Sequence, residues 1–273
     1  MPGQHQLGKI VVCLTLTLIL LQPVSCLAQE KDSSVVQQVA DSVVAQMKAP
    51  ITQVPVTLRS LIIPGALFAY GAITLNVDFL RKQNTEVKEF LWDHNPHRKF
   101  PVEDYTLLLP AAAVYGLNIA GIKGQNNFID RSVIYGLSNA IANGIVFGVK
   151  KFSIELRPDS SDRYSFPSGH TAEAFVSAEF LHQEYKGRIH WTVIAGGYAI
   201  AVGTGILRMY NNKHWFSDVL AGAGVGIAST RFAYYLYPLA KHLIFGSKKV
   251  KGSAMILPTY QNGVFGFAAA LKF

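Results

Sequence analysis

The chain has 273 residues, of which 50% are hydrophobic and only 15% are charged. Soluble domains usually carry about 25% charged residues, so this composition favours a membrane protein built as one large domain. The net charge of +8 does not indicate nucleic-acid binding, because Lys and Arg are scattered between apolar stretches rather than gathered along one helix. The only cysteines, Cys13 and Cys26, lie near the start of the chain, which excludes a disulfide framework and a cysteine-based metal site in its body.

Residues 1–28 have the layout of a secretory signal peptide. A short polar start is followed by an apolar block from Ile10 to Leu21 and then by small residues that lead to Ala28. This pattern predicts export to the cell envelope with cleavage after Ala28. Two alternatives stay open: a lipid anchor on Cys26, which Pro23 disfavours, and an uncleaved first membrane helix.

The rest of the chain divides into three parts. Residues 29–59 form a polar segment that we expect to be helical, with interruptions near Pro50 and Pro55. Residues 60–245 hold six long apolar segments without the two-residue alternation of strands, so they predict an all-α bundle of about six core helices. These segments are Ser60–Leu75, Tyr105–Ile122, Ser132–Val149, Thr171–Tyr185, Trp191–Met209 and Val219–Leu239. In the tail, residues 246–273, an Asn-Gly pair between two short apolar runs is typical of a β-hairpin.

Membrane embedding is the preferred interpretation of this bundle, although a soluble bundle stays open. A helix needs about 20 apolar residues to span a bilayer, and several segments fall short. The segment after Thr171 carries Glu173 and Glu179, and Pro64 is expected to break the first segment. Gly222 and Gly226 form a GxxxG pattern, which permits close helix contact in a membrane bundle; ordinary packing of small residues is the alternative interpretation.

The charges of the loops indicate an orientation. If the last four segments span the bilayer, the basic connections share one face, which the positive-inside tendency makes cytoplasmic. The loops after Val149 and Met209 then lie outside. Counting back places the start of the first segment inside, whereas a cleaved leader places it outside, so either this segment does not cross or the bundle does not span in this simple way. The basic residues concerned are Lys123, Arg131, Lys186, Arg188, Lys241, Lys248, Lys249 and Lys251.

A first polar motif follows the third apolar segment. Lys150 and Arg157 are seven positions apart, about two turns if the helix continues, so both cations would point the same way. By itself this pattern is also that of a basic helix end stopped by Pro158.

A second motif, Pro167-Ser168-Gly169-His170, directly precedes a helical stretch. Gly169 lets the backbone approach a ligand closely, and the free N–H groups of the first helical turn favour an anion. The Ser168 hydroxyl can add a donor, and His170 would lie at the edge of this site. The alternative is an ordinary helix cap followed by an exposed histidine.

A third motif contains Arg208, His214 and Asp218. On one helix, residues four positions apart share a face, so the Asp218 carboxylate could accept the N–H of one imidazole nitrogen of His214. The other nitrogen would then be a lone-pair nucleophile with its orienting group.

In order, the three motifs read KxxxxxxRP, PSGH and RxxxxxHxxxD. With them the sequence resembles the type 2 phosphatidic acid phosphatase (PAP2) superfamily, which includes bacterial class A acid phosphatases and vanadium haloperoxidases. The resemblance covers about residues 132–239. One position departs from it, because Leu207 stands where the family commonly has serine before the third-motif arginine.

The resemblance implies a mechanism for these residues. His214 would attack phosphorus and form a phosphohistidine, while Asp218 would hold the ring of His214 and support its charge. His170 would protonate the departing alcohol oxygen and then activate water. No metal or other cofactor is implied. The groups that would bind the non-bridging phosphate oxygens are Lys150, Arg157, Arg208, the Ser168 hydroxyl and the N–H of Gly169.

The expected function is hydrolysis of lipid phosphate monoesters or diphosphates at the periplasmic side of the cytoplasmic membrane. Candidate substrates are a phosphatidate-type glycerolipid, phosphatidylglycerol phosphate, polyprenyl diphosphate and the phosphates of lipid A. The alternatives are a soluble periplasmic non-specific acid phosphatase, a haloperoxidase, and a non-catalytic membrane transporter or scaffold. The expected partners are the lipid phosphate substrate and membrane lipids, without nucleic acid, and the sequence indicates no oligomeric state.

Overall fold

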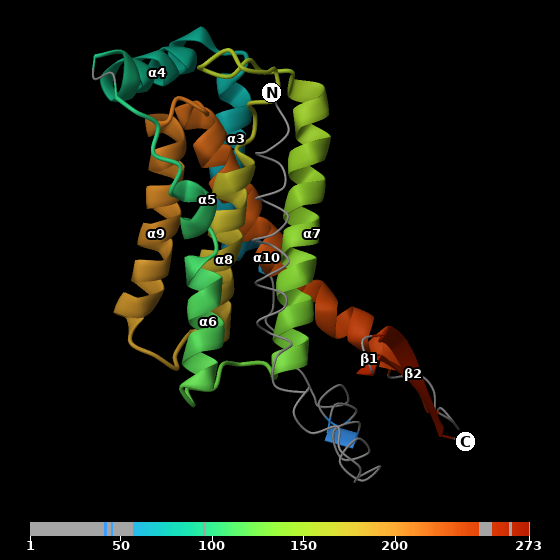
Figure 1. Ribbon diagram of the computed structural model, residues 1–273. Helices are drawn as coiled ribbons and strands as arrows, with labels where there is room; N and C mark the ends of the chain where they lie inside the picture. Colours follow the sequence, from blue (N-terminus) through green and yellow to red (C-terminus); the bar gives the residue numbers. More distant parts are fainter. Residues whose placement is uncertain are drawn as a thin grey trace. The chain divides into compact units, whose positions relative to one another are not determined.

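The computed structural model describes residues 41, 42, 45, 57–94, 97–245, 253–261 and 264–272 (Figure 1). The chain divides into two compact units, residues 1–47 and 48–273. The expected signal peptide and most of the polar segment 29–59 lie outside the described residues. Within that segment, residues 41, 42 and 45 are described and are helical.

The all-α prediction for the body of the chain is confirmed. The helices are α3 (Leu58–Thr74), α4 (Asp78–Lys88), the π-helical turn η1 (Glu89–Asp93), α5 (Glu103–Thr106), α6 (Leu109–Ile119), α7 (Phe128–Ser153), α8 (Gly169–Tyr185), α9 (Trp191–Tyr210) and α10 (Phe216–Phe245). In the tail, β1 (Ser253–Gln261) and β2 (Val264–Lys272) pair antiparallel. Gln261 is opposite Val264, and the Asn-Gly pair between them lies outside the described residues.

The helices differ from the sequence-based expectation in three respects. The segment Tyr105–Ile122 is divided into α5 and α6, with Pro110 in the first turn of α6, a position that proline tolerates because its missing N–H has no helical partner there. The helices α4 and η1 were not expected: α4 is short and polar on average, although amphipathic, and η1 is a single turn, so neither forms a long apolar segment. The expected break of the first segment is wrong, since α3 continues through Pro64.

The continuity of α3 has a physical reason. Proline has no N–H, so Pro64 leaves the carbonyl of Ser60, four residues earlier, without its helical partner. The guanidinium of Arg231, on α10, donates to this carbonyl. Arg231 Nε also donates to Glu179 Oε1 at 2.8 Å, and Glu179 is fully buried on α8. A side chain from a neighbouring helix thus replaces the bond that the proline removes.

Glycines bring α10 close to its neighbours. A Cβ atom built on Gly222 or Gly226 would lie under 3.0 Å from a carbonyl oxygen of the second motif or of α8, namely that of Ser168 or Ala172. One built on Gly224 would lie equally close to the carbonyl oxygen of Pro64 on α3. The close contact expected from the GxxxG pattern is therefore present, and it joins α10 to α8.

The bundle has two distinct ends. At one end Gln125 N donates to the carbonyl of Glu184 at 2.9 Å, and Lys241 Nζ donates to Asp130 Oδ2 at 2.8 Å. These bonds bring the connection before α7, the end of α8 and the last part of α10 together. We call this the basic end, because Lys123, Lys186 and Arg188 lie in the connections there. Opposite it is the motif end, formed by residues 150–170 and 208–218, and α4 lies across this end in Figure 1.

By length and composition, α7 and α9 could each cross a membrane. The pair formed by α3 and α4–η1 meets the same test together but is bent by 95°. Both long helices expose large apolar side chains, which a bilayer would cover. Among them are Val133, Phe147 and Phe152 on α7 and Trp191, Val202 and Ile206 on α9.

Candidate active site

In the first motif, α7 ends between the two cations, Lys150 and Arg157. Lys150 lies in the last turn of α7, and its ammonium group donates to the backbone carbonyls of Tyr164 and Ser165. The helix ends at Ser153 because Ile154 adopts a left-handed conformation, with φ of 46°. The expectation of one continuous helix carrying both cations is therefore wrong.

Arg157 instead stands in the loop that follows α7. Its Nε lies 3.0 Å from Asp162 Oδ1, and its backbone N–H donates to the carbonyl of Asp162 at 3.0 Å. The loop turns back on itself through these two contacts, and the turn returns the guanidinium to the motif end.

The second motif begins α8. Ser168 is the N-cap residue, and its buried hydroxyl oxygen accepts from Thr171 N and, at 2.9 Å, from Thr171 Oγ1. The backbone N–H of Ser168 donates to the carbonyl of Asp218 at 3.0 Å, which joins the second motif to the third. A Cβ atom on Gly169 would meet only Val146, at 3.7 Å, so protein packing does not require a glycine there.

In the third motif, His214 and Asp218 pair without sharing a helix. His214 stands in the loop before α10, and Asp218 is the third residue of that helix. The Asp218 carboxylate reaches back: its Oδ2 accepts from the N–H of Trp215 at 2.9 Å, as in a capping box, and lies 3.3 Å from His214 Nδ1. The expected face on one helix is therefore wrong, although the expected pair is present.

Ser165 completes the surroundings of this pair. Its hydroxyl donates to Asp218 Oδ2 at 2.5 Å and lies 3.5 Å from His214 Nδ1. Asp218 is fully buried and His214 is 3% exposed, and among the described residues Asp218 accepts hydrogen bonds only through Oδ2. With Nδ1 facing Asp218, the Nε2 atom of His214 is the nitrogen available for chemistry.

The cations of the motifs surround His214 electrostatically. Burial lowers the pKa of the His214 imidazole well below its usual value, and the charges of Arg208, Lys150 and Arg157 lower it further. His170 acts on it in the same direction. The two imidazoles and three cations therefore meet at one end of the bundle, and His214 is neutral at neutral pH.

Two carboxylates on α5 contact this cluster, and sequence reasoning missed both. Glu103, only 3% exposed, accepts through Oε1 from Arg208 Nη1 at 3.1 Å and from Asn211 Nδ2 at 2.8 Å. Asp104 Oδ1 lies 2.9 Å from His170 Nε2. Their only local signal was two acidic residues at a helix start, which is common in helices of any function.

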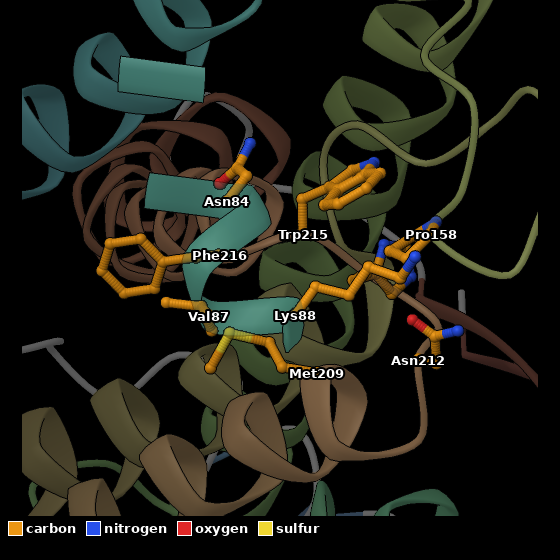
Figure 2. A pocket seen from close by; sticks show the side chains of 9 residues that line it. Asn84, Val87, Lys88, Pro158, Met209, Asn212, Trp215 and Phe216 are labelled. Carbon is orange, nitrogen blue, oxygen red and sulfur yellow. The ribbon is translucent and has the colours of Figure 1, made fainter. Parts of the chain in front are cut away.

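A small pocket borders the loop that carries His214, on the side of α4 (Figure 2). Lys88 of α4 extends across it, and the buried Oδ1 of Asn212 has no hydrogen-bond partner among the described residues. Its lining residues are Asn84, Val87, Lys88, Pro158, Met209, Asn212, His214, Trp215 and Phe216. Within the described part of the chain, no cluster of three or more His, Cys, Asp or Glu side chains could hold a metal ion.

Residues 131–241 match the family model described as PAP2 superfamily. A lipid A 1-phosphatase from Porphyromonas gingivalis is 36% identical over 174 residues, which are 63% of this chain but 38% of that protein. This chain thus spans well under half the length of that curated relative.

Two solved structures are similar at lower identity. The crystal structure of Aquifex aeolicus LpxE is 22% identical, with a TM-score of 0.41 over 55% of this chain and 93% of that one. The crystal structure of a transmembrane PAP2-type phosphatidylglycerolphosphate phosphatase from Bacillus subtilis is also 22% identical, with a TM-score of 0.44 over 69% and 98% of the two chains.

Proposed function

We propose that this chain is a metal-independent phosphatase that hydrolyses lipid phosphate monoesters or diphosphates, because residues 131–241 match the PAP2 superfamily model. The observation that carries the proposal is the meeting of His214, His170 and three cations at one end of the bundle. Phosphoryl transfer needs an in-line nucleophile and positive charge around the equatorial oxygens, and this cluster supplies both.

In the first step, Nε2 of His214 attacks phosphorus while its Nδ1 stays on Asp218. A P–N bond forms and the bond from phosphorus to the leaving oxygen breaks. His170 gives its proton to that oxygen, so the product leaves as an alcohol, or as a lipid monophosphate when the substrate is a diphosphate. The negative charge on the non-bridging oxygens is balanced by Lys150, Arg157 and Arg208, with hydrogen bonds from the Ser168 hydroxyl and the N–H of Gly169.

In the second step, water attacks the phosphohistidine. The imidazole of His170, now neutral, takes a proton from the water, the P–N bond breaks, and inorganic phosphate leaves. His214 returns neutral and His170 returns protonated, so the protons balance over the cycle. This is general acid catalysis followed by general base catalysis by one residue.

A membrane lipid is the substrate class that the fold favours. The cluster lies at the end of α7 and α9, the two helices that could cross a bilayer, so a lipid head group can reach it while the acyl chains stay in the membrane. The basic end lies opposite. Positive loops tend to stay in the cytoplasm, which supports an active site facing the periplasm. Lipid A 1-phosphate is our preferred substrate because of the similarity to the Porphyromonas gingivalis lipid A 1-phosphatase.

The test is release of phosphate by purified full-length protein in detergent with EDTA present. The substrates are lipid A, phosphatidate, phosphatidylglycerol phosphate, polyprenyl diphosphate and a water-soluble phosphomonoester. We expect hydrolysis of at least one lipid, inhibition by orthovanadate, and no turnover by His214→Ala. His190→Asn is the matched control, because His190 is an exposed cap at the opposite end of α9 and should tolerate replacement.

Undiminished activity of His214→Ala would exclude the proposed nucleophile, and dependence on an added divalent ion would exclude the metal-independent mechanism. Activity confined to the soluble ester would favour a non-specific acid phosphatase instead.

A further inference from the structure

Asp104 forms a hydrogen bond with the proposed acid–base histidine, although it lies outside all three motifs. Its Oδ1 is 2.9 Å from His170 Nε2. Both side chains are partly exposed, at 46% for Asp104 and 37% for His170, so the pair lies at the open edge of the cluster rather than in the packed core. A core-stabilising role therefore does not account for it.

The position of Asp104 is fixed by its neighbour in the chain. Glu103 is bonded to Arg208 and Asn211, and the Asn211 side chain also accepts from Phe100 N at 2.7 Å and donates to the carbonyl of Phe100 at 2.9 Å. These bonds attach the start of α5 to the end of α9. Asp104 is consequently held next to His170 by buried contacts that do not involve His170 itself.

The hydrogen bond decides which imidazole nitrogen of His170 can act. A carboxylate accepts a hydrogen bond from a ring N–H, so the neutral ring keeps its proton on Nε2 and presents the lone pair of Nδ1. Among the described residues, Nδ1 of His170 has no hydrogen-bond partner. The site therefore contains two imidazole–carboxylate pairs with opposite atoms engaged, Nδ1 of His214 on Asp218 and Nε2 of His170 on Asp104.

We propose that Asp104 is the positioning residue of the acid–base histidine, holding the Nε2–H of His170 so that Nδ1 is the atom that transfers the proton. This inference rests on the proposed phosphatase function. In the first step the Nδ1–H bond of the imidazolium breaks and the proton moves to the leaving oxygen. In the second step Nδ1 accepts a proton from the attacking water, while Asp104 keeps its bond to Nε2 throughout.

Other charges face His170, and they define the control. Arg208 on α9 and the ring of His214 face it from the third motif, while Glu173 lies one turn along α8. Glu173 has a carboxylate charge close to His170 but no hydrogen bond to it. Asp104→Asn replaces the charged acceptor of the Nε2–H of His170 with a neutral amide, whereas Glu173→Gln removes a nearby charge and leaves that acceptor in place. Comparing the two variants therefore separates the charge-assisted hydrogen bond from the effect of a nearby charge alone.

The experiment compares two soluble phosphomonoesters with full-length protein in detergent. p-Nitrophenyl phosphate has a leaving group that needs little protonation, whereas n-octyl phosphate has one that needs a general acid. For Asp104→Asn we expect kcat/KM for octyl phosphate to fall about 10- to 100-fold, and that for p-nitrophenyl phosphate to fall less than about threefold. Glu173→Gln should stay near wild type on both substrates, and Asp104→Glu should recover part of the loss.

Equal losses on both substrates would overturn the proposal, as would a loss in Glu173→Gln that matches that of Asp104→Asn. Faster turnover by Asp104→Asn would also overturn it, because Asp104 would then block the site. Unchanged kinetics of that variant beside an active wild type would refute the role of Asp104 alone. A wild-type protein without phosphatase activity would refute the proposed function itself.

Discussion

Asp218 shows how much a single side chain decides at this site. Its Oδ2 atom lies against His214 Nδ1 and accepts hydrogen bonds from the Ser165 hydroxyl and from the N–H of Trp215 at the start of α10. One carboxylate therefore fixes both the start of α10 and the orientation of the His214 ring. Replacing it would disturb the local fold as well as the chemistry, so His214 is the better position at which to test the mechanism.

The electrostatic surroundings of His214 lead to a prediction about pH. Burial and nearby cations hold the pKa of His214 below its ordinary value of 6.5, so the ring stays neutral and nucleophilic when the solution becomes mildly acidic. We expect the limb of kcat/KM that belongs to the nucleophile to fall only below pH 6.5. The measurement is a pH–rate profile with two substrates whose phosphate groups ionise at different pH values. A limb that belongs to the enzyme falls at the same pH for both substrates, whereas a limb due to substrate ionisation does not.

A nucleophile limb centred at or above pH 6.5 would contradict this account, because the cations would then not be acting on His214.

The sequence predicts which motif residues come together at one end of the bundle, but it does not predict their surroundings. Spacing was sufficient to pair His214 with Asp218, although a helix start rather than a helical face joins them. Nothing near the motifs pointed to Glu103 or Asp104, because these residues precede the first motif by more than 40 positions and reach the site only through tertiary packing. The arrangement of the two motif-end loops was likewise set by long-range contacts.

At the scale of elements, the glycines of α10 determine how closely the helices of the site approach one another. Gly222 and Gly226 let α10 contact α8 at backbone distance, next to the second motif. The GxxxG pattern was legible in the sequence because small residues four positions apart have one main use in packed helices. By contrast α4 was missed, since its composition is that of a polar connection.

We predict that Gly226→Ala destabilises the protein by about 1–3 kcal/mol or more, because its Cβ would press on the carbonyl oxygen of Ala172 and backbone cannot rotate away. The midpoint of thermal unfolding in detergent should fall. Gly203→Ala on α9 is the control: a Cβ there meets nothing within 4 Å, and alanine is the better helix former.

An unchanged midpoint for Gly226→Ala would contradict the close approach of the α10 backbone to the carbonyl oxygen of Ala172 on α8.

At the scale of the whole molecule, the length and apolar composition of α7 and α9 indicate that the bundle lies in a bilayer. The sequence left membrane embedding open because several core segments carry polar residues. The structure explains part of this polarity: Glu179 and Glu184, both on α8, are fully buried and paired with Arg231 and Arg131 from neighbouring helices. A charge that is buried and paired within the bundle does not face lipid, so it is compatible with a membrane environment.

We therefore expect the full-length protein to stay with the membrane fraction after washing with alkaline carbonate, because α7 and α9 would remain in the bilayer. The measurement is an immunoblot of the pellet and the supernatant, with a soluble periplasmic protein as the released control. Release of this chain into the supernatant together with that control would favour the soluble alternative.

The bond between Arg231 and the carbonyl of Ser60 links two positions that are 171 residues apart along the chain. With any residue other than proline at position 64, the backbone of α3 would satisfy that carbonyl itself, and the arginine would lose one of its reasons to be there. In homologous sequences the two positions should therefore covary, with loss of the proline relaxing the constraint on the arginine.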